Sequence, residues 1–142
     1  MPAFGLVDYC RIGCDVTLDW DDKPHMRLAH RERISTRQSI GNTVYRRQLN
    51  GRAWLNDPDV FFLRDENLKL TDGQKYLLAT VNSVLGGVLL HSDNMAKYGA
   101  VAKAQYEQLL RNREAKNVRV DNERGLTLSY ELGGRRMSVK IE

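Results

Sequence analysis

The fold is decided by residues 71–93, which read TDGQKYLLATVNSVLGGVLLHSD. Thr71 and Gln74 have the spacing of a capping box, in which each side chain accepts a hydrogen bond from the other residue's backbone N–H. A helix should therefore begin here. Three apolar residues then recur at the spacing of one helix face. They are Leu77, Val81 and Val84.

Two glycines and a second apolar run follow this helix. Gly86 and Gly87 fit the C-terminal cap of a helix, and residues 87–93 read as a short buried strand that ends on Asp93. Earlier in the chain, residues 4–13 read as another buried strand, because apolar and β-compatible side chains run almost without a break.

A further strand is predicted from RAWLN at 52–56. It should end near Asn56, because the residue before a proline is extended and Pro58 donates no ladder hydrogen bond. Short apolar strands alternating with helices predict a parallel sheet with right-handed crossovers. We expect the acids that close these strands to share its carboxyl edge, where α/β barrels hold their active sites. They are Asp15, Asp57 or Asp59, and Asp93.

The remaining segments predict two more helices and a hairpin. Residues 27–50 read as a helix whose loosely spaced apolar positions favour covering a surface over filling a core. Residues 100–113 read as another helix, and its apolar positions are Val101, Tyr106, Leu109 and Leu110. Alternating runs at 126–132 and 137–141 flank a Gly-Gly pair, which is typical of a β-hairpin.

The composition is that of a soluble globular protein with one ordinary domain. The 142 residues are 42% hydrophobic and 28% charged, with a net charge of +4. Neither stacking aromatics nor a Gly-rich phosphate loop accompanies the basic residues, so a nucleic-acid partner is not expected. The N-terminus does not read as a signal peptide, and the longest apolar stretch, at 76–90, is interrupted and too short to cross a bilayer. We expect no membrane association.

The cysteines indicate a reducing compartment. On a strand, Cys10 and Cys14 would lie about 13 Å apart, beyond disulfide reach, so we expect both to be small buried hydrophobes in a cytoplasmic protein. No metal site is predicted. The acid run at 19–22 lacks the glycine and bidentate glutamate of a calcium loop, and the three histidines share no ligand spacing.

Two motifs resemble a known family. RIGCDVTLDW at 11–20 and WLNDPD at 54–59 resemble segments in the C-terminal third of the catalytic barrel of α-galactosidases from glycoside hydrolase family 36. The resemblance covers residues 3–98. It implies an α/β fold in which residues 1–98 are the last strands and helices of a (β/α)8 barrel. Residues 99–142 would then be a connecting helix and a small antiparallel β element.

The resemblance also implies a chemistry. In that family two carboxylates hydrolyse terminal α-galactosyl residues with retention of configuration, without a cofactor. The general acid/base role is carried onto Asp15, and substrate contacts onto Arg11, Asp59 and Trp20. Arg11 should lie on the same side of the strand as Asp15, because strand side chains repeat with a period of two. Asp57 reads better as a residue that shapes the turn around Pro58.

Simpler interpretations of these residues stay open. Arg11 would also suit a structural ion pair with Asp8 or Asp59. Asp15 would suit a solvated loop acid or a helix cap, and Trp20 would suit a side chain that packs the loop.

One part of the family's machinery has no counterpart in this sequence. The nucleophile of the family lies on the fourth barrel strand, and no matching segment occurs here. We therefore expect the C-terminal part of a longer, homo-oligomeric enzyme that acts on α-galactosides, inactive on its own. The alternative is a small self-sufficient α/β binding or assembly module without catalysis.

Overall fold

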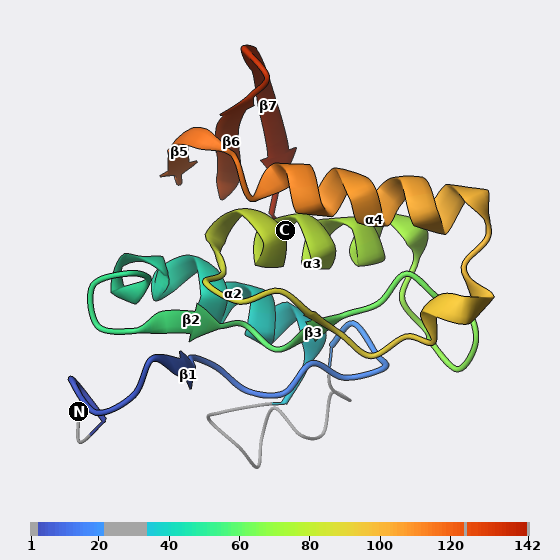
Figure 1. The fold of residues 1–142 in the computed structure, drawn as a ribbon, viewed down its shortest axis with the longest axis horizontal. Helices are drawn as coiled ribbons and strands as arrows, with labels where there is room; N and C mark the ends of the chain where they lie inside the picture. The colour runs from blue at the N-terminus through green and yellow to red at the C-terminus, as the bar shows by residue number, and fades with distance from the viewer. Residues whose placement is uncertain (1–2, 22–33, 124, 142) are drawn as a thin grey trace.

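The structure is a computed structural model that describes residues 3–21, 34–123 and 125–141. Its central helix, α3 (Asp72–Leu85), separates a layer of short parallel strands from a three-stranded antiparallel sheet (Figure 1). The fold is thus a mixture of helices and strands arranged around one central helix.

The start of α3 confirms the predicted capping box. Thr71 Oγ1 accepts a hydrogen bond from Gln74 N at 3.3 Å, and Gln74 Oε1 accepts one from Thr71 N at 2.9 Å. Leu77 and Val81 are buried, and Val84 is partly buried against the same core. The apolar face read from the sequence is therefore the face that packs.

The two glycines after α3 allow a close approach of chain segments. Gly86 is the C-cap, although its backbone is extended (φ −77°) and not left-handed. A Cβ on Gly86 would lie 2.5 Å from Asn82 O and 2.9 Å from Pro58 Cγ. One on Gly87 would lie 2.6 Å from Asn56 N. Only glycine lets the end of α3 lie this close to the neighbouring strand.

Four short strands form two parallel ladders. β1 (Tyr9–Arg11) pairs with β2 (Leu55–Asp57), and β3 (Val60–Phe61) pairs with β4 (Leu90–His91). Pro58 lies between β2 and β3, where the ladder is interrupted as predicted. The parallel strand–helix–strand order is confirmed, and in the described residues the strands form separate ladders without closing a barrel.

The predicted buried strands are shorter and more exposed than expected. Of residues 4–13, only Tyr9–Arg11 pair, and the side chains of Phe4 and Leu6 are 64% and 80% exposed. Leu90, in the strand predicted at 87–93, is also exposed. An apolar run shows that a segment suits a buried position, but burial also needs a neighbour, and among the described residues β1 has a single neighbouring strand.

The helix predicted at 27–50 is observed as α2 (Thr36–Tyr45), with residues 27–33 outside the described part of the chain. The prediction that it covers a surface is wrong. Ile40 and Val44 are fully buried, and the helix packs against α3.

Small hydroxyl side chains explain why the pattern misled. Thr36, Ser39 and Thr43 lie on the buried face of α2, where each hydroxyl donates to a backbone carbonyl. The acceptors are Thr17 O, Pro58 O and Ser39 O, respectively, at 2.8, 3.3 and 3.1 Å. Because these polar atoms are satisfied, the face is buried without apolar periodicity.

The helix predicted at 100–113 is confirmed as α4 (Ala100–Asn112), but only two of its four apolar positions pack against the core. Leu109 is buried, and Tyr106 packs partly against the core. Val101 and Leu110 are exposed, so these two apolar positions do not pack into the core. Helix α3 covers α4 on one side only (Figure 1).

The C-terminal hairpin is confirmed. β6 (Thr127–Leu132) and β7 (Arg135–Lys140) pair in antiparallel, and the linking Gly133 and Gly134 have φ values of 55° and 76°. Such positive φ values are accessible to glycine without strain. β5 (Lys116–Asp121) adds a third strand that the sequence did not predict, because its residues are mostly polar and exposed.

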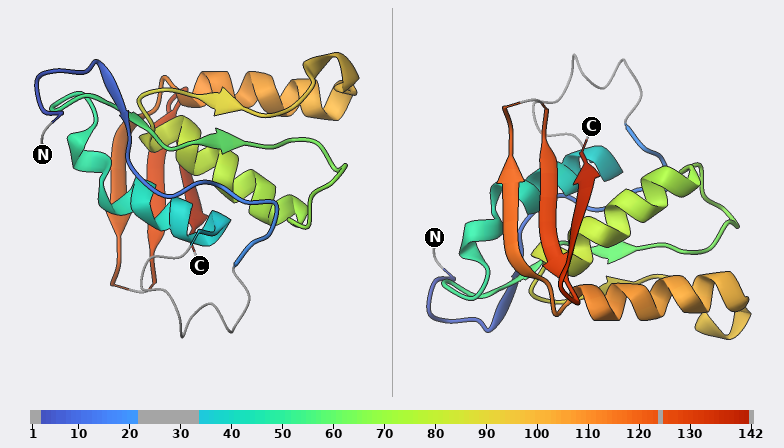
Figure 2. Two further views of the ribbon diagram at one scale, coloured as in Figure 1. Left: turned by 90° about the horizontal axis from the view of Figure 1, so that it is seen from below. Right: turned by 90° about the horizontal axis from the view of Figure 1, so that it is seen from above.

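One hydrophobic cluster joins these layers. It includes Phe61, Leu78, Leu128 and Ile141. The antiparallel sheet and the parallel strands therefore pack on opposite sides of α3. Viewed from above, the antiparallel sheet overlies α2 and α3 (Figure 2). The described residues also include two short 3₁₀ helices, η1 (Arg47–Leu49) and η2 (Met95–Lys97). The division of the chain at residues 98 and 99 stays a prediction.

Two smaller expectations concern membranes and cysteines. No helix in the described residues combines the length and the apolar character needed to cross a membrane. Cys10 and Cys14 are both free thiols, as predicted, but each is half-buried and not buried.

Candidate active site

Arg11 contacts three carboxylates at the carboxyl ends of β1 and β2. Its Nη1 lies 2.9 Å from Asp15 Oδ1, its Nη2 lies 2.9 Å from Asp59 Oδ1, and its Nε lies 3.3 Å from Asp57 Oδ2. The parallel register places Arg11 directly opposite Asp57. We call these four residues the acid cluster; sequence reasoning predicted that Arg11 and Asp15 would share a side, and the contact confirms it.

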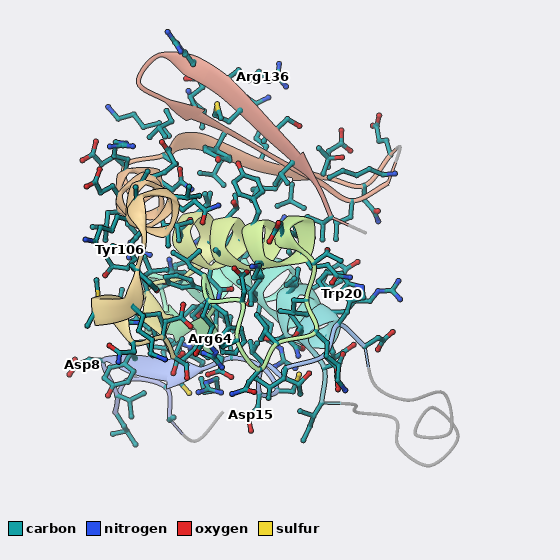
Figure 3. The ribbon with its side chains drawn as sticks, turned by 90° about the vertical axis from the view of Figure 1, so that its right-hand side faces the viewer. Asp8, Asp15, Trp20, Arg64, Tyr106 and Arg136 are labelled. Atoms are coloured by element: carbon teal, nitrogen blue, oxygen red, sulfur yellow. The ribbon has the colours of Figure 1, made fainter. Side chains whose placement is uncertain are left out.

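The three carboxylates differ strongly in exposure. The side chains of Asp57 and Asp59 are only 11% and 10% exposed, whereas that of Asp15 is 74% exposed. Asp15 lies on the face of the molecule opposite Arg136 of the antiparallel sheet (Figure 3). Asp15 is therefore the one member of the acid cluster that presents a largely open carboxylate.

Asp57 and Asp59 are tied into the turn around Pro58. Asp57 Oδ1 accepts a hydrogen bond from Asp59 N at 2.8 Å, which confirms the predicted turn-shaping role. Asp59 has a φ of 74°, a left-handed conformation that is uncommon outside glycine, though aspartate tolerates it better than most residues. Its Oδ2 accepts from Val16 N at 2.7 Å. The Asp59 carboxylate thus holds Arg11 and Val16, which flank Asp15.

The charges in the acid cluster do not balance. One guanidinium faces three carboxylates, so the formal net charge of the cluster is −2. Burial lowers the pKa of Arg11, but the attraction of Asp59 and then of Asp57 outweighs it and the net shift is upward. Arg11 stays a fixed cation. Its Nε and Nη1 donate hydrogen bonds to Asp57 and Asp15, and its Nη2 forms an ion pair with Asp59, so each of the three nitrogens faces a carboxylate.

A second carboxylate group lies at the ends of β3 and β4. Asp93 Oδ2 accepts hydrogen bonds from Leu63 N, Arg64 N and the Tyr98 hydroxyl at 2.5, 3.2 and 2.8 Å. Asp93 Oδ1 accepts from Arg64 Nη1 at 2.8 Å. We call these four residues the Asp93 cage. The Asp93 side chain is completely buried, so it is not an open acid at the sheet edge as the sequence suggested.

The Asp93 cage also changes the chemistry of its tyrosine. Burial, followed by the hydrogen bond to Asp93, raises the pKa of Tyr98 well above its ordinary value. The guanidinium of Arg64 lies 4.6 Å from the centre of the Phe62 ring, which fixes its orientation. This arrangement suits a structural role.

The other predicted residues fall in different places. Trp20 packs partly buried against the hydrophobic core and lines a hollow beside Thr71 and Val139, apart from Asp15 (Figure 3). This contact matches the loop-packing interpretation, and its sugar contact stays a prediction. Of the two alternative ion partners of Arg11, Asp59 is in contact and Asp8 is not among those found in the described residues.

A further hollow lies away from the acid cluster. A groove of about 360 Å³ runs between α3 and α4, and Lys75, nearly buried in its wall, pairs with the exposed Asp65 and Asp72. No acid-cluster residue lines it.

Among the described residues, no group of three or more His, Cys, Asp or Glu is placed to hold a metal ion. The acid cluster thus combines an exposed carboxylate with a fixed cation and two buried acids.

The fold is related to that of a glycosidase. No protein-family model matches the chain. Its structure is similar to that of TtGalA, the α-galactosidase from Thermus thermophilus, solved in complex with p-nitrophenyl α-D-galactopyranoside. The TM-score is 0.69 at 23% sequence identity, and the match covers 95% of this chain and 27% of that chain. This chain therefore spans about a quarter of the length of the α-galactosidase whose fold it shares in part.

Proposed function

We propose that this chain supplies the general acid/base, Asp15, to a retaining α-galactosidase of the family 36 type. The rest of a (β/α)8 barrel would supply the nucleophile. The observation that carries the proposal is the exposed Asp15 carboxylate, held by Arg11 at a strand end, in a fold shared in part with an α-galactosidase. Its substrate would be a terminal α-galactosyl group, and we expect a cytoplasmic homo-oligomer that needs no cofactor.

The exposure of Asp15 suits proton transfer. In the first half of a retaining reaction the acid protonates the leaving oxygen while the nucleophile attacks the anomeric carbon. In the second half the same residue deprotonates the water that releases the sugar. A carboxylate with one partner keeps lone pairs for both steps. The nucleophile would lie about 5 to 5.5 Å from it.

The other members of the acid cluster have supporting roles in this proposal. Arg11 orients Asp15, and those of its five N–H donors that are not bound to Asp15 or Asp57 would contact substrate hydroxyls. Asp57 and Asp59, nearly buried and each bound to Arg11, hold the guanidinium in place.

The test is Asp15→Ala in the complete gene product. Hydrolysis of an alkyl α-galactoside, whose leaving group is strongly basic, should fall by about 10²- to 10⁴-fold. An activated aryl α-galactoside should still form the glycosyl-enzyme, and azide should restore its turnover. The matched control is Asp19→Ala, which removes another exposed aspartate, whose ion partner among the described residues is Lys69, and it should leave kinetics unchanged.

Two results would refute the proposal. Equal losses for both substrates without azide rescue would remove Asp15 from the acid/base role. A complete gene product that hydrolyses no α-galactoside would instead support a binding or assembly module.

A further inference from the structure

The turn that carries Asp59 is held by both helices packed beneath it. From α2, the Ser39 hydroxyl donates to Pro58 O at 3.3 Å. From α3, Asn82 Nδ2 donates to Asp59 O at 3.2 Å. With the bond from Asp59 N to Asp57 Oδ1, three polar contacts surround the one left-handed residue of this turn.

These contacts stabilise a conformation that costs free energy. A non-glycine residue at positive φ persists where the surrounding structure over-determines it. Asn82 and Ser39 are both buried, and the Asn82 Oδ1 has no hydrogen-bond partner among the described residues. An apolar side chain of the same size would avoid that unpaired atom. The reason for an amide at position 82 is thus the hydrogen bond from its Nδ2 to Asp59 O, and not a contribution to the hydrophobic core.

Holding Asp59 fixes the chain on both sides of Asp15. The Asp59 carboxylate contacts Arg11 Nη2 at 2.9 Å and Val16 N at 2.7 Å. Arg11 in turn contacts Asp15. A rotation of the turn at Asp59 would release both anchors together.

We infer that Asn82 is a positioning residue, which locks the left-handed Asp59 through its carbonyl and thereby sets the placement of Asp15. The inference rests on the proposed function for the role of Asp15, and it adds a residue of α3 that has no side-chain contact with Asp15 itself. Ser39 is a second, weaker clamp on the same turn.

The first measurement is amide hydrogen exchange at Val16, in the complete gene product. Asn82→Leu, which keeps the branched shape of the side chain and removes the donor, should speed exchange at Val16 by about tenfold or more, because local opening becomes easier. Ser39→Ala should speed it by a smaller factor, and it serves as the readout if Asn82→Leu does not fold.

The matched control is Asn112→Leu. Asn112 is also a buried amide, and it donates to Ser83 on α3 at 3.1 Å without touching the turn. It should destabilise the protein but leave Val16 exchange relative to the other amides unchanged. In an Asp59→Gly background, where no carboxylate holds Val16, Asn82→Leu should have no further effect on that exchange.

The second measurement separates positioning from stability. If Asn82 sets the placement of the acid, Asn82→Leu should lower kcat/KM for an alkyl α-galactoside at least about tenfold more than for an aryl one, because kcat/KM reports the first half of the reaction, in which only the alkyl leaving group needs protonation. Equal losses for both substrates, or unchanged Val16 exchange, would overturn the inference. The exchange experiment needs no catalysis. It therefore tests whether Asn82 holds the turn even if the proposed function is wrong.

Discussion

The acid cluster and the Asp93 cage are opposite solutions to placing a carboxylate at the end of a parallel strand. In the acid cluster, one guanidinium serves three acids, and the outermost of them, Asp15, is largely exposed. In the cage, one buried acid accepts from four donors. With four donors and a fully buried side chain, Asp93 presents no exposed oxygen to a substrate, whereas Asp15 is exposed and has one partner among the described residues. Both acids follow a parallel strand, so the number of hydrogen-bond donors around each carboxylate, more than its position, distinguishes the structural Asp93 from the candidate catalytic Asp15.

Removal of the buried acid should have the largest effect. Asp93→Ala leaves Arg64 without its anion and leaves two backbone N–H groups without an acceptor, so the free energy of unfolding should fall by about 3 kcal/mol. Urea titration of the variant would measure it. Asp15→Asn is the opposite case and should change stability by less than about 0.5 kcal/mol. Similar losses in the two variants would contradict the distinction between a structural Asp93 and an Asp15 that does not stabilise the fold.

Removal of the shared cation should have an intermediate effect. Arg11→Met keeps most of the length but leaves Asp57 and Asp59 nearly buried and mutually repelling, so unfolding should become easier by about 2 kcal/mol near pH 7. Asp57→Asn in the Arg11→Met background should recover part of the loss, because it removes one of the two repelling charges. Arg37→Met, which removes an exposed and longer ion pair with Asp21, is the control, with an expected loss of about 0 to 1 kcal/mol. A double variant that recovers none of the loss would mean that packing, and not charge, makes Arg11 important.

The smallest effect concerns Tyr98, and it depends on pH. Burial and then Asp93 raise the pKa of Tyr98 above its ordinary value of 10.0, so the unfolded chain ionises first as pH rises. The contribution of this residue is therefore complete below pH 10.0 and is lost progressively above it.

Tyr98→Phe should lower stability by about 1 kcal/mol at neutral pH and flatten the decline above the ordinary pKa. Thermal unfolding across that range would measure both. Tyr45→Phe, at an exposed tyrosine, should change neither. An unchanged alkaline decline in Tyr98→Phe would show that the cage does not depend on the protonated hydroxyl.

Local signals made the central part of this fold predictable. The capping box at Thr71 and the Gly-Gly hairpin depend on neighbouring residues alone, and both are confirmed. The contact between Arg11 and Asp15 was also predicted, but β1 ends at Arg11, so the loop after the strand, and not strand periodicity, brings the two side chains together. By contrast, the burial of α2 depends on hydroxyl groups that find carbonyl partners far along the chain, such as Ser39 with Pro58. No local pattern reports such a contact.

The site was predictable in its composition but not in its geometry. The sequence placed Asp15, Asp59 and Asp93 at strand ends, yet it could not tell which of these carboxylates would be saturated by donors. It also gave no sign that Asn82 would reach the turn, because an asparagine inside an apolar helix pattern reads only as an interruption. These features arise from tertiary contacts between α2, α3 and the turn.

Gly86 and Gly87, after α3, also affect the turn that carries Asp59, although they have no side chain. A methyl group on Gly86 would press on Pro58, and one on Gly87 would press on Asn56, so either substitution would push the turn that carries Asp59. Selection for the chemistry would then act on Gly86 and Gly87 as strongly as on the carboxylates themselves. In an evolutionary comparison, the two glycines should vary together with Pro58 as a single inherited unit, and a lineage that lost Asp15 would be free to lose all three.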